Sequence, residues 1–441
     1  NQLSLLAGSG DLVVGGTIGS GTLLGAIGSQ SNQMLGLIAT GDAISLPSVF
    51  AGTQNILIIA SGSFTSLATV NTTVNGSPVT PTSLRTRSGG SITVTGAGTA
   101  AVPGAIDSDG FVLFSNGGTT TLGNQIITSN DLITFTGNVI ATTNLTMNAG
   151  TGSIGFAPTS TVNLGAGNSV LTADEINLPT GANAVSGNGT TTTLRLQTAT
   201  ASQNLTLGNA AADGDGTFEL SDSELSSLAS SITSLTIGRS NGSGSILINT
   251  AAFRSTVLIQ APTGAGVITA NGITQETLGA DVTLNGSTAT QIGADIITRG
   301  GDITIQDSVV LTADIALDTT NGGSVTGVAN TGNITIAGTI EGATNGNEGI
   351  TLSAGTSGTA GVDGLISLGG PVGASNAVAF FTIASADSAS LPSIRSAPST
   401  AGSSASTTPV WSRSVPLPSM SKVVSCRMPA QPATSAWART S

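Results

Sequence analysis

The stretch "GADIITRGGDITIQDSVVLTADIALDT", residues 293–319, decides the fold class. Aliphatic singles and pairs recur in it about every seven residues, and Thr, Asp and Gly separate them. Inside each short segment, such as "DITI" at 302–305, apolar and polar residues alternate with period two. That alternation predicts short β-strands with one buried face, joined by turns that contain Gly and Asp.

The same pattern extends along most of the chain. Examples are "SITVT" at 91–95, "LITFT" at 132–136, "DVTL" at 281–284 and "NITI" at 333–336, with Gly-rich turns between such segments. Strands at this spacing fit a sandwich, a barrel or a β-solenoid.

Internal repetition favours the solenoid. Residues 123–152 align without a gap on residues 293–322, an offset of about 170, and "GDAISLPSV" (41–49) matches "ADSASLPSI" (386–394) at about twice that offset. The identities of the first pair include Ile126 with Ile296, Thr128 with Thr298, Ile133 with Ile303, Val139 with Val309 and Thr142 with Thr312. No stretch with the composition of a linker lies between the copies. Stacked coils would explain this, because each coil packs directly on the next.

We therefore predict an all-β body over residues 1–394, a parallel β-helix (β-solenoid) built from about two copies of a roughly 170-residue module. Its coils are expected to contain roughly 20–25 residues. Ile, Val and Leu point inward, while Thr, Ser and Asn at equivalent outward positions hydrogen-bond along the stack.

One segment, "FELSDSELSSLASSITSLTIGRSNGSGSI" at 218–246, departs from the strand pattern. Ser221 and Glu224 have the spacing of a capping box, and Leu225, Leu228 and Ile232 follow at helical spacing. This predicts one short helix that packs on the solenoid or covers an edge. We interpret Glu224 as the cap of a surface turn rather than as a ligand group.

Composition excludes several functions. The 441 residues carry a net charge of −12, only 8% charged residues, one Cys and no His. The negative charge argues against nucleic acid as a partner and against anionic membrane surfaces. One Cys cannot form an internal disulfide framework, and without His neither a Ser-His-Asp nor a Cys-His catalytic unit nor a His-dependent zinc site can be built.

The remaining carboxylates suggest little chemistry. Asp213 and Asp215 in "AADGDGTFEL" are suitable oxygen ligands for calcium, but a single "DGDG" is a frequent turn string. Asp174 and Glu175 are adjacent, so on a strand they point to opposite faces, which is poor geometry for an acid/base pair. We predict no catalytic, cofactor-binding or metal-binding residues and no cofactor.

Residues 395–441 differ chemically from the body. No acidic residue follows Asp387, while this segment holds the only Lys, the only Cys and both Trp. Repeat register and composition change together after Ile394, so we predict that 395–441 is disordered or translated in a shifted frame. A basic tail, a linker and a wall-binding segment are the alternatives.

Three motifs carry a family resemblance: "ELSDSELSSLASSITSLTIGRSNGSGSI" (219–246), the series at 293–319, and "GLISLGGPVGASNAVAFFTIASADSASLPSI" (364–394). They resemble the filamentous-haemagglutinin-like and autotransporter-type large repetitive surface adhesins of Gram-negative bacteria. The resemblance implies a right-handed β-helix, exported through an outer-membrane secretion pore and then secreted or held at the cell surface. Its partners would be glycans or proteins on host or neighbouring cells.

Together these observations predict a non-enzymatic adhesin or haemagglutinin-like passenger fragment that acts as an elongated stalk or adhesive rod. The alternative is a β-helical carbohydrate-active enzyme, a lyase or hydrolase, because pectin-degrading enzymes share the β-helix. Such enzymes bind acidic sugars with basic residues and calcium-binding Asp clusters. Residues 1–394 hold six Arg, no Lys and no Asp triplet, which disfavours a polyanion site. The six are Arg85, Arg87, Arg195, Arg239, Arg254 and Arg299.

Overall fold

The computed structural model describes most of the chain: residues 2–7, 10, 12–13, 26–27, 36–46, 48–51, 54–66, 73–74, 77–78, 82–188, 191–209, 217–325, 332–355, 363–394 and 424–427. The chain divides into two compact units, residues 1–288 and residues 289–441. The regular secondary structure of the described residues is nearly all β-strand, with one short helix, α1 (Asp222–Ser227).

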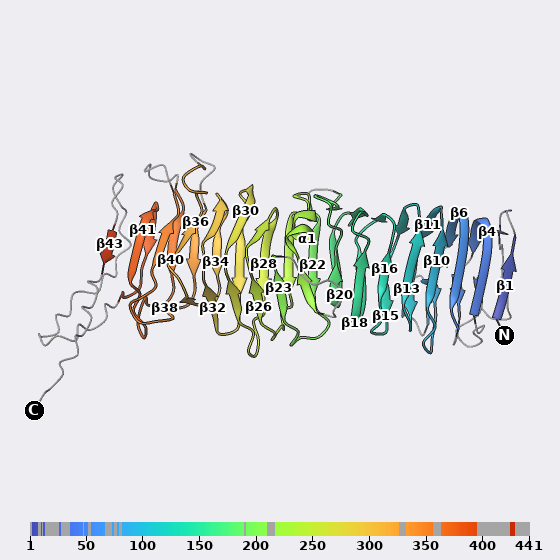
Figure 1. Ribbon diagram of the computed structural model, residues 1–441, viewed down its shortest axis with the longest axis horizontal. Helices are drawn as coiled ribbons and strands as arrows, with labels where there is room; N and C mark the ends of the chain where they lie inside the picture. The colour runs from blue at the N-terminus through green and yellow to red at the C-terminus, as the bar shows by residue number, and fades with distance from the viewer. Residues whose placement is uncertain are drawn as a thin grey trace, which may run out of the picture. The chain divides into compact units, whose positions relative to one another are not determined.

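Unit 1 is built from parallel ladders in which each coil places a strand on the previous one (Figure 1). In the first ladder Ile92, Val112, Ile133 and Ile154 are direct neighbours at steps of about 20 residues, and all four are buried. Its strands are β1 (Gln2–Leu6), β4 (Gly36–Leu46), β6 (Ile56–Ser66), β10 (Ile92–Gly96), β13 (Val112–Asn116), β16 (Ile133–Phe135), β18 (Thr146–Phe156) and β20 (Asn168–Asn177).

Two further ladders complete each coil of this part. The second contains β2 (Leu12–Val13), β4, β6, β11 (Thr99–Val102), β14 (Thr120–Leu122), β17 (Val139–Ala141), β19 (Val162–Asn163) and β21 (Val185–Ser186). The third contains β3 (Ala26–Ile27), β5 (Ser48–Phe50), β9 (Thr82–Arg85), β12 (Ala105–Ser108), β15 (Ile126–Thr128), β18, β20, β22 (Thr193–Gln197), β25 (Ser234–Gly238), β28 (Thr256–Gln260) and β31 (Val282–Asn285). Long strands such as β4 and β18 bend from one ladder into another. This architecture confirms the predicted parallel β-helix.

The later coils of unit 1 carry shorter ladders on their other sides. One is formed by β24 (Phe218–Leu220), β23 (Leu205–Leu207), β26 (Ile246–Ile248) and β29 (Ile268–Ala270), and another by β27 (Ala251–Phe253) and β30 (Ile273–Leu278). The pair β7 (Thr73–Val74) and β8 (Ser77–Pro78) is antiparallel. The coil between β22 and β25 is about twice the usual length, because it contains α1.

The interior of unit 1 contains a column of aromatic rings that the sequence analysis did not predict. Phe114 and Phe135 stack with ring centroids 5.2 Å apart, and Phe135 and Phe156 with centroids 5.7 Å apart. The three lie in register on β13, β16 and β18. Stacked rings at this separation add to the stabilisation from burying each side chain, which is about 1.5–3 kcal/mol.

The corner between β10 and β11 requires glycine. Gly96 has φ of 140°, which L side chains rarely adopt, and a Cβ at this residue would overlap the backbone carbonyl of Ala60. A Cβ at Gly98 would overlap the carbonyl of Gly62. Successive coils therefore approach each other here too closely for a side chain.

A recurrent hydrogen bond links successive coils in both units. The Asn or Asp directly before a strand accepts, through Oδ1, the backbone N–H of the equivalent residue in the next coil. We call these residues the Asx ladder: Asn55 accepts from Ser91, Asn138 from Thr161, Asn204 from Ser245, Asp295 from Ala316, Asp302 from Asn333, Asp314 from Gly349 and Asn333 from Leu365. Polar side chains thus bond along the stack, as predicted. The Asx ladder bonds to backbone N–H groups, and other equivalent positions, such as Thr193 and Asn168, bond side chain to side chain.

Unit 2 also contains three parallel ladders. They are β32 (Ala289–Ile292), β35 (Ser308–Leu311) and β38 (Ile340–Gly342); β33 (Ile296–Arg299), β36 (Ile315–Asp318), β39 (Ile350–Ser353) and β41 (Phe380–Ser385); and β34 (Ile303–Ile305), β37 (Ile334–Ile336), β40 (Leu365–Leu368) and β42 (Ser388–Ser390). Ile303, Ile334 and Ile366 are neighbours at steps of about 30 residues. The predicted coil of 20–25 residues is too short for this part of unit 2.

The two aligned segments make the same local contacts in their separate units. Thr128 and Thr298 are both buried, and each hydroxyl donates to the carbonyl three residues later, that of Asp131 at 2.6 Å and that of Gly301 at 2.5 Å. Thr142 and Thr312 likewise each donate their backbone N–H across to the previous coil. The identities that the alignment identified are therefore positions of equal structural role.

The segment predicted to be disordered or frame-shifted, residues 395–441, lies outside the described residues with one exception. That exception is β43 (Val424–Arg427), which pairs antiparallel with β41.

Candidate functional site

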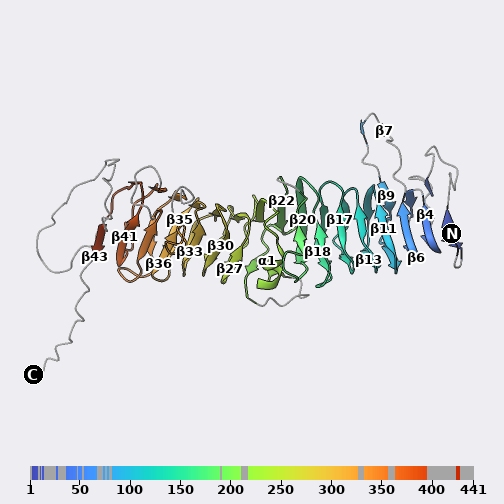
Figure 2. The ribbon, with the colours of Figure 1, turned by 90° about the horizontal axis from the view of Figure 1, so that it is seen from above.

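The predicted helix is present but shorter than its apolar spacing suggested. The capping box is formed: the Ser221 side chain accepts from the N–H of Glu224, and the Glu224 carboxylate accepts from the N–H of Ser221. Leu225 and Leu228 are buried as expected. The helix ends at Ser227, so the inclusion of Ile232 in it was wrong, although Ile232 is fully buried. Figure 2 shows α1 on the outside of the strands of unit 1.

Glu224 has a different role from the surface cap that the sequence suggested. It is 1% exposed, and its Oε1 accepts the backbone N–H of Leu178 at 2.7 Å, just after β20. Its Oε2 accepts from the N–H and the hydroxyl of Ser221. A buried carboxylate must be satisfied by such donors. Glu224 therefore ties α1 to the solenoid, which corrects the earlier interpretation.

Arg254 fixes the other end of α1. It follows β27, and its Nε lies 2.6 Å from Oε2 of Glu276, an outward residue of β30. Its Nη1 donates to the carbonyl of Ser226 in α1 at 2.9 Å and to Oδ1 of Asn183 at 3.2 Å. One guanidinium thus joins the helix, the strand β30 and the turn at Asn183.

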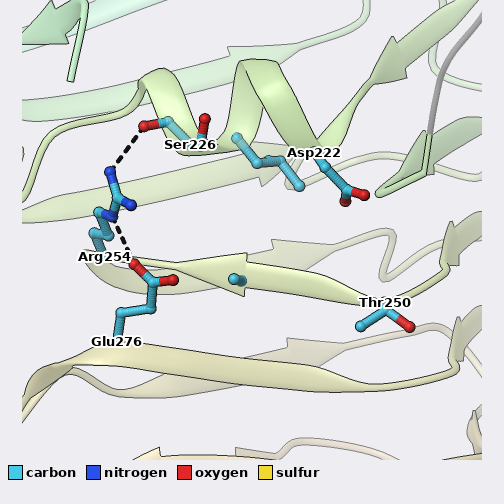
Figure 3. A pocket seen from close by; sticks show the side chains of 7 residues that line it. Asp222, Ser226, Thr250, Arg254 and Glu276 are labelled. Carbon is cyan, nitrogen blue, oxygen red and sulfur yellow. Dashed lines mark hydrogen bonds and ion pairs between the residues drawn. The ribbon is translucent and has the colours of Figure 1, made fainter. Parts of the chain in front are cut away.

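A pocket of about 220 Å³ lies between α1 and the outward face of β27 and β30 (Figure 3). We call it the α1 pocket; it is lined by Asp222, Leu225, Ser226, Thr250, Ala252, Arg254 and Glu276. Figure 3 shows Arg254 and Glu276 together on one side and Asp222 and Thr250 on the other.

A second charged cluster lies on β9 and β12. Nε of Arg85 lies 3.0 Å from Oδ2 of Asp107, Nη2 of Arg87 lies 2.6 Å from the same oxygen, and Nη1 of Arg87 lies 3.7 Å from Asp109. Burial alone would raise the pKa of Asp107, but the hydrogen bond and charge of Arg87 and the charge of Arg85 hold that pKa below its ordinary value. The two guanidinium groups are neutralised by neighbouring carboxylates, so this cluster does not form a polyanion site.

The other residues that the sequence analysis considered do not form a reactive group. Asp174 is buried and accepts the N–H of Thr200 at 2.7 Å and its hydroxyl at 2.5 Å. Glu175 is half-buried and accepts from Asn177. Asp213 and Asp215 lie outside the described residues. Within the described ranges no group of three or more His, Cys, Asp or Glu side chains is arranged to hold a metal ion.

The sequence analysis missed Arg254 and Glu276 as neighbours. They are 22 residues apart, which is one coil of this region, so they occupy equivalent positions on adjacent strands. The coil length together with the opposite charges was the available signal. To predict this contact, one must know which residues of β27 and β30 are paired. The spacing of apolar residues in these two strands does not define that pairing.

No protein-family model, curated protein or solved structure matches the chain. Among the described helical residues, none belong to a helix long and apolar enough to cross a membrane.

Proposed function

We propose that this chain is a non-enzymatic adhesin or haemagglutinin-like passenger fragment, secreted or displayed at the surface of a Gram-negative bacterium. The observation that carries the proposal is the construction of each unit: inward aliphatics form continuous ladders, while the turns are held by the Asx ladder. Such a body exposes a long, regular polar exterior on which binding sites can be placed. The motifs that resemble large repetitive adhesins support the same role as a stalk or adhesive rod.

The connectivity suits export as an extended chain. Most strands pair with the coil directly before and after them, so each coil can fold onto its predecessor without distant contacts. Transit through an outer-membrane secretion pore followed by coil-by-coil folding is the route we propose.

The proposed partners are glycans or proteins on host or neighbouring cells. The net charge of −12 disfavours nucleic acid and anionic lipid surfaces, because both repel an acidic protein. Arg85, Arg87 and Arg254 are each paired with a carboxylate, which also disfavours a highly anionic polysaccharide as the main partner.

The test is an adhesion assay with the full chain. Beads coated with folded protein are expected to bind cultured epithelial cells or bacterial cells more than beads coated with heat-unfolded protein. In parallel, the protein is incubated with neutral and acidic polysaccharides, and release of reducing ends or of unsaturated products is measured. Adhesion without product release supports the proposal; product release without adhesion favours a β-helical carbohydrate-active enzyme instead.

A further inference from the structure

We propose that the α1 pocket binds a single neutral sugar residue of a glycan. This inference deepens the proposed adhesive function, on which it rests, by naming a site and a ligand class.

The size of the pocket sets the first limit. Its volume of about 220 Å³ lies below the range of roughly 300–1,000 Å³ that drug-sized ligands occupy. One pyranose ring with its hydroxyl groups is a ligand of the right scale. A longer glycan would therefore place one residue in the pocket and extend over the surface outside it.

The polar groups of the pocket include both donors and acceptors that no described residue engages. Nη1 and Nε of Arg254 bond to Ser226, Asn183 and Glu276, whereas Nη2 donates to no atom of the described residues. The hydroxyl of Thr250 and Oδ2 of Asp222 also make no hydrogen bond within the described part of the chain, while Oδ1 of Asp222 accepts from Asn209. Figure 3 shows Arg254 at one side of the pocket and Asp222 and Thr250 at the opposite side.

Sugar hydroxyl groups match this arrangement because each can donate and accept. One hydroxyl can accept from Nη2 of Arg254 while another donates to the Asp222 carboxylate and exchanges a bond with Thr250. An alkyl amine would satisfy the carboxylate but leave the guanidinium N–H groups without an acceptor. Ala252 and Leu225 supply the apolar surface against which the C–H groups of a ring can pack.

Charge excludes acidic sugars. Glu276 neutralises Arg254 at 2.6 Å, so the carboxylate of Asp222 leaves the pocket with a net negative charge. A uronate, sulfate or phosphate group would be repelled by that carboxylate. The ligand therefore carries no negative charge.

The pocket walls are held in place before a ligand arrives. Glu224 anchors the start of α1 to Leu178, and Arg254 anchors its end to β30 and Asn183. Pre-formed geometry reduces the ordering cost of binding.

The experiment is saturation-transfer difference NMR on the full chain with galactose, glucose, mannose and fucose, and with glucosamine and glucuronate as charged counterparts. We expect transfer to at least one neutral sugar and none to glucuronate. Thr250→Val and Asp222→Ala are each expected to weaken binding by about tenfold, since each removes one hydrogen-bonding group. Thr236→Val, an outward Thr on β25, is the matched control and leaves binding unchanged.

Circular dichroism and melting temperature equal to wild type show that the variants are folded. The proposal is overturned by binding of glucosamine or glucuronate only, by no transfer to any sugar, or by binding that survives both pocket substitutions. The bead assay distinguishes failure of the sugar-binding proposal from failure of the adhesive function. If no sugar binds and adhesion persists, only the assignment of the α1 pocket is contradicted. If sugar binds and adhesion is absent, the adhesive function is contradicted.

Discussion

Asn333 donates both its backbone N–H and its side-chain amide to Oδ1 of Asp302 in the preceding coil, at 2.7 Å and 3.1 Å. Asn333 then accepts, through its own Oδ1, the backbone N–H of Leu365 in the following coil. Three coils of unit 2 are thereby linked by one continuous run of the Asx ladder.

Removal of an acceptor from this run should loosen it locally. Asp302→Ala leaves the N–H of Asn333 without that partner, and we expect a loss of about 1–2 kcal/mol in the free energy of unfolding. Hydrogen exchange measures the effect directly, as faster exchange of the Asn333 amide. Asp302→Asn retains an Oδ1 acceptor and should keep most of the protection. Equal exchange in Asp302→Ala and wild type would contradict the role of the ladder.

The Asp107 cluster predicts a pH dependence of stability. The folded-state pKa of Asp107 lies below the unfolded value of about 3.9, so its contribution is fully present above that value and is lost as the pH falls through the folded-state pKa. We expect Asp107→Asn to destabilise the protein by about 1–2 kcal/mol at pH 7. The difference in melting temperature from wild type should shrink below pH 4.

Asp42 provides the comparison for this titration. It is exposed and accepts one hydrogen bond from Ser61, so Asp42→Asn should change stability by less than about 0.5 kcal/mol at either pH. A melting-temperature difference for Asp107→Asn that is the same at pH 7 and pH 3 would refute the ionic explanation.

Loss of the Glu224 carboxylate should release α1. Glu224→Ala leaves the N–H of Leu178 and that of Ser221 without this acceptor, with an expected cost of about 2–3 kcal/mol. Limited proteolysis around residues 222–228 should become faster while strand content by circular dichroism is kept. Glu224→Gln, which preserves an acceptor oxygen, should be intermediate. Unchanged proteolysis of Glu224→Ala would show that the other contacts of α1, the packing of Leu225 and the bond from Arg254 to Ser226, suffice to hold the helix.

The column of rings in unit 1 should tolerate aliphatic replacement better than truncation. Phe135 is fully buried between Phe114 and Phe156, so Phe135→Ala should cost about 3–5 kcal/mol by leaving a cavity. Phe135→Leu keeps most of the volume and should cost less than half as much. Chemical denaturation monitored by circular dichroism distinguishes the two; equal midpoints would indicate that the neighbours close the gap.

The inward-facing residues of the ladders could be predicted from the sequence, because the alternation of apolar and polar residues within one strand identifies its buried face. Ile126 and Ile296, for example, are both buried where the alternation places them. Coil length in unit 2 was underestimated, since residues added in turns leave the strand pattern unchanged. The role of Glu224 was missed for a physical reason: its partner Leu178 belongs to another coil, and capping-box spacing reports only the local bond. The α1 pocket likewise depends on which strands become neighbours.

Gly98 cannot be replaced by a residue with a side chain, because a Cβ there would overlap the carbonyl of Gly62. The donor residues of the Asx ladder are less restricted. In each link of the ladder a backbone N–H is a donor, and residues as different as Gly349, Ala316, Thr161 and Leu365 supply it. Asn333 adds a bond from its side-chain amide. Where there is space for its side chain, another residue that retains the N–H can replace a donor, and the bond between coils persists. Gly349 is an exception, because a Cβ there would overlap the ring of Phe380. Exposed donor residues can therefore change the chemistry of the outer surface while the hydrogen bonds that join successive coils are kept.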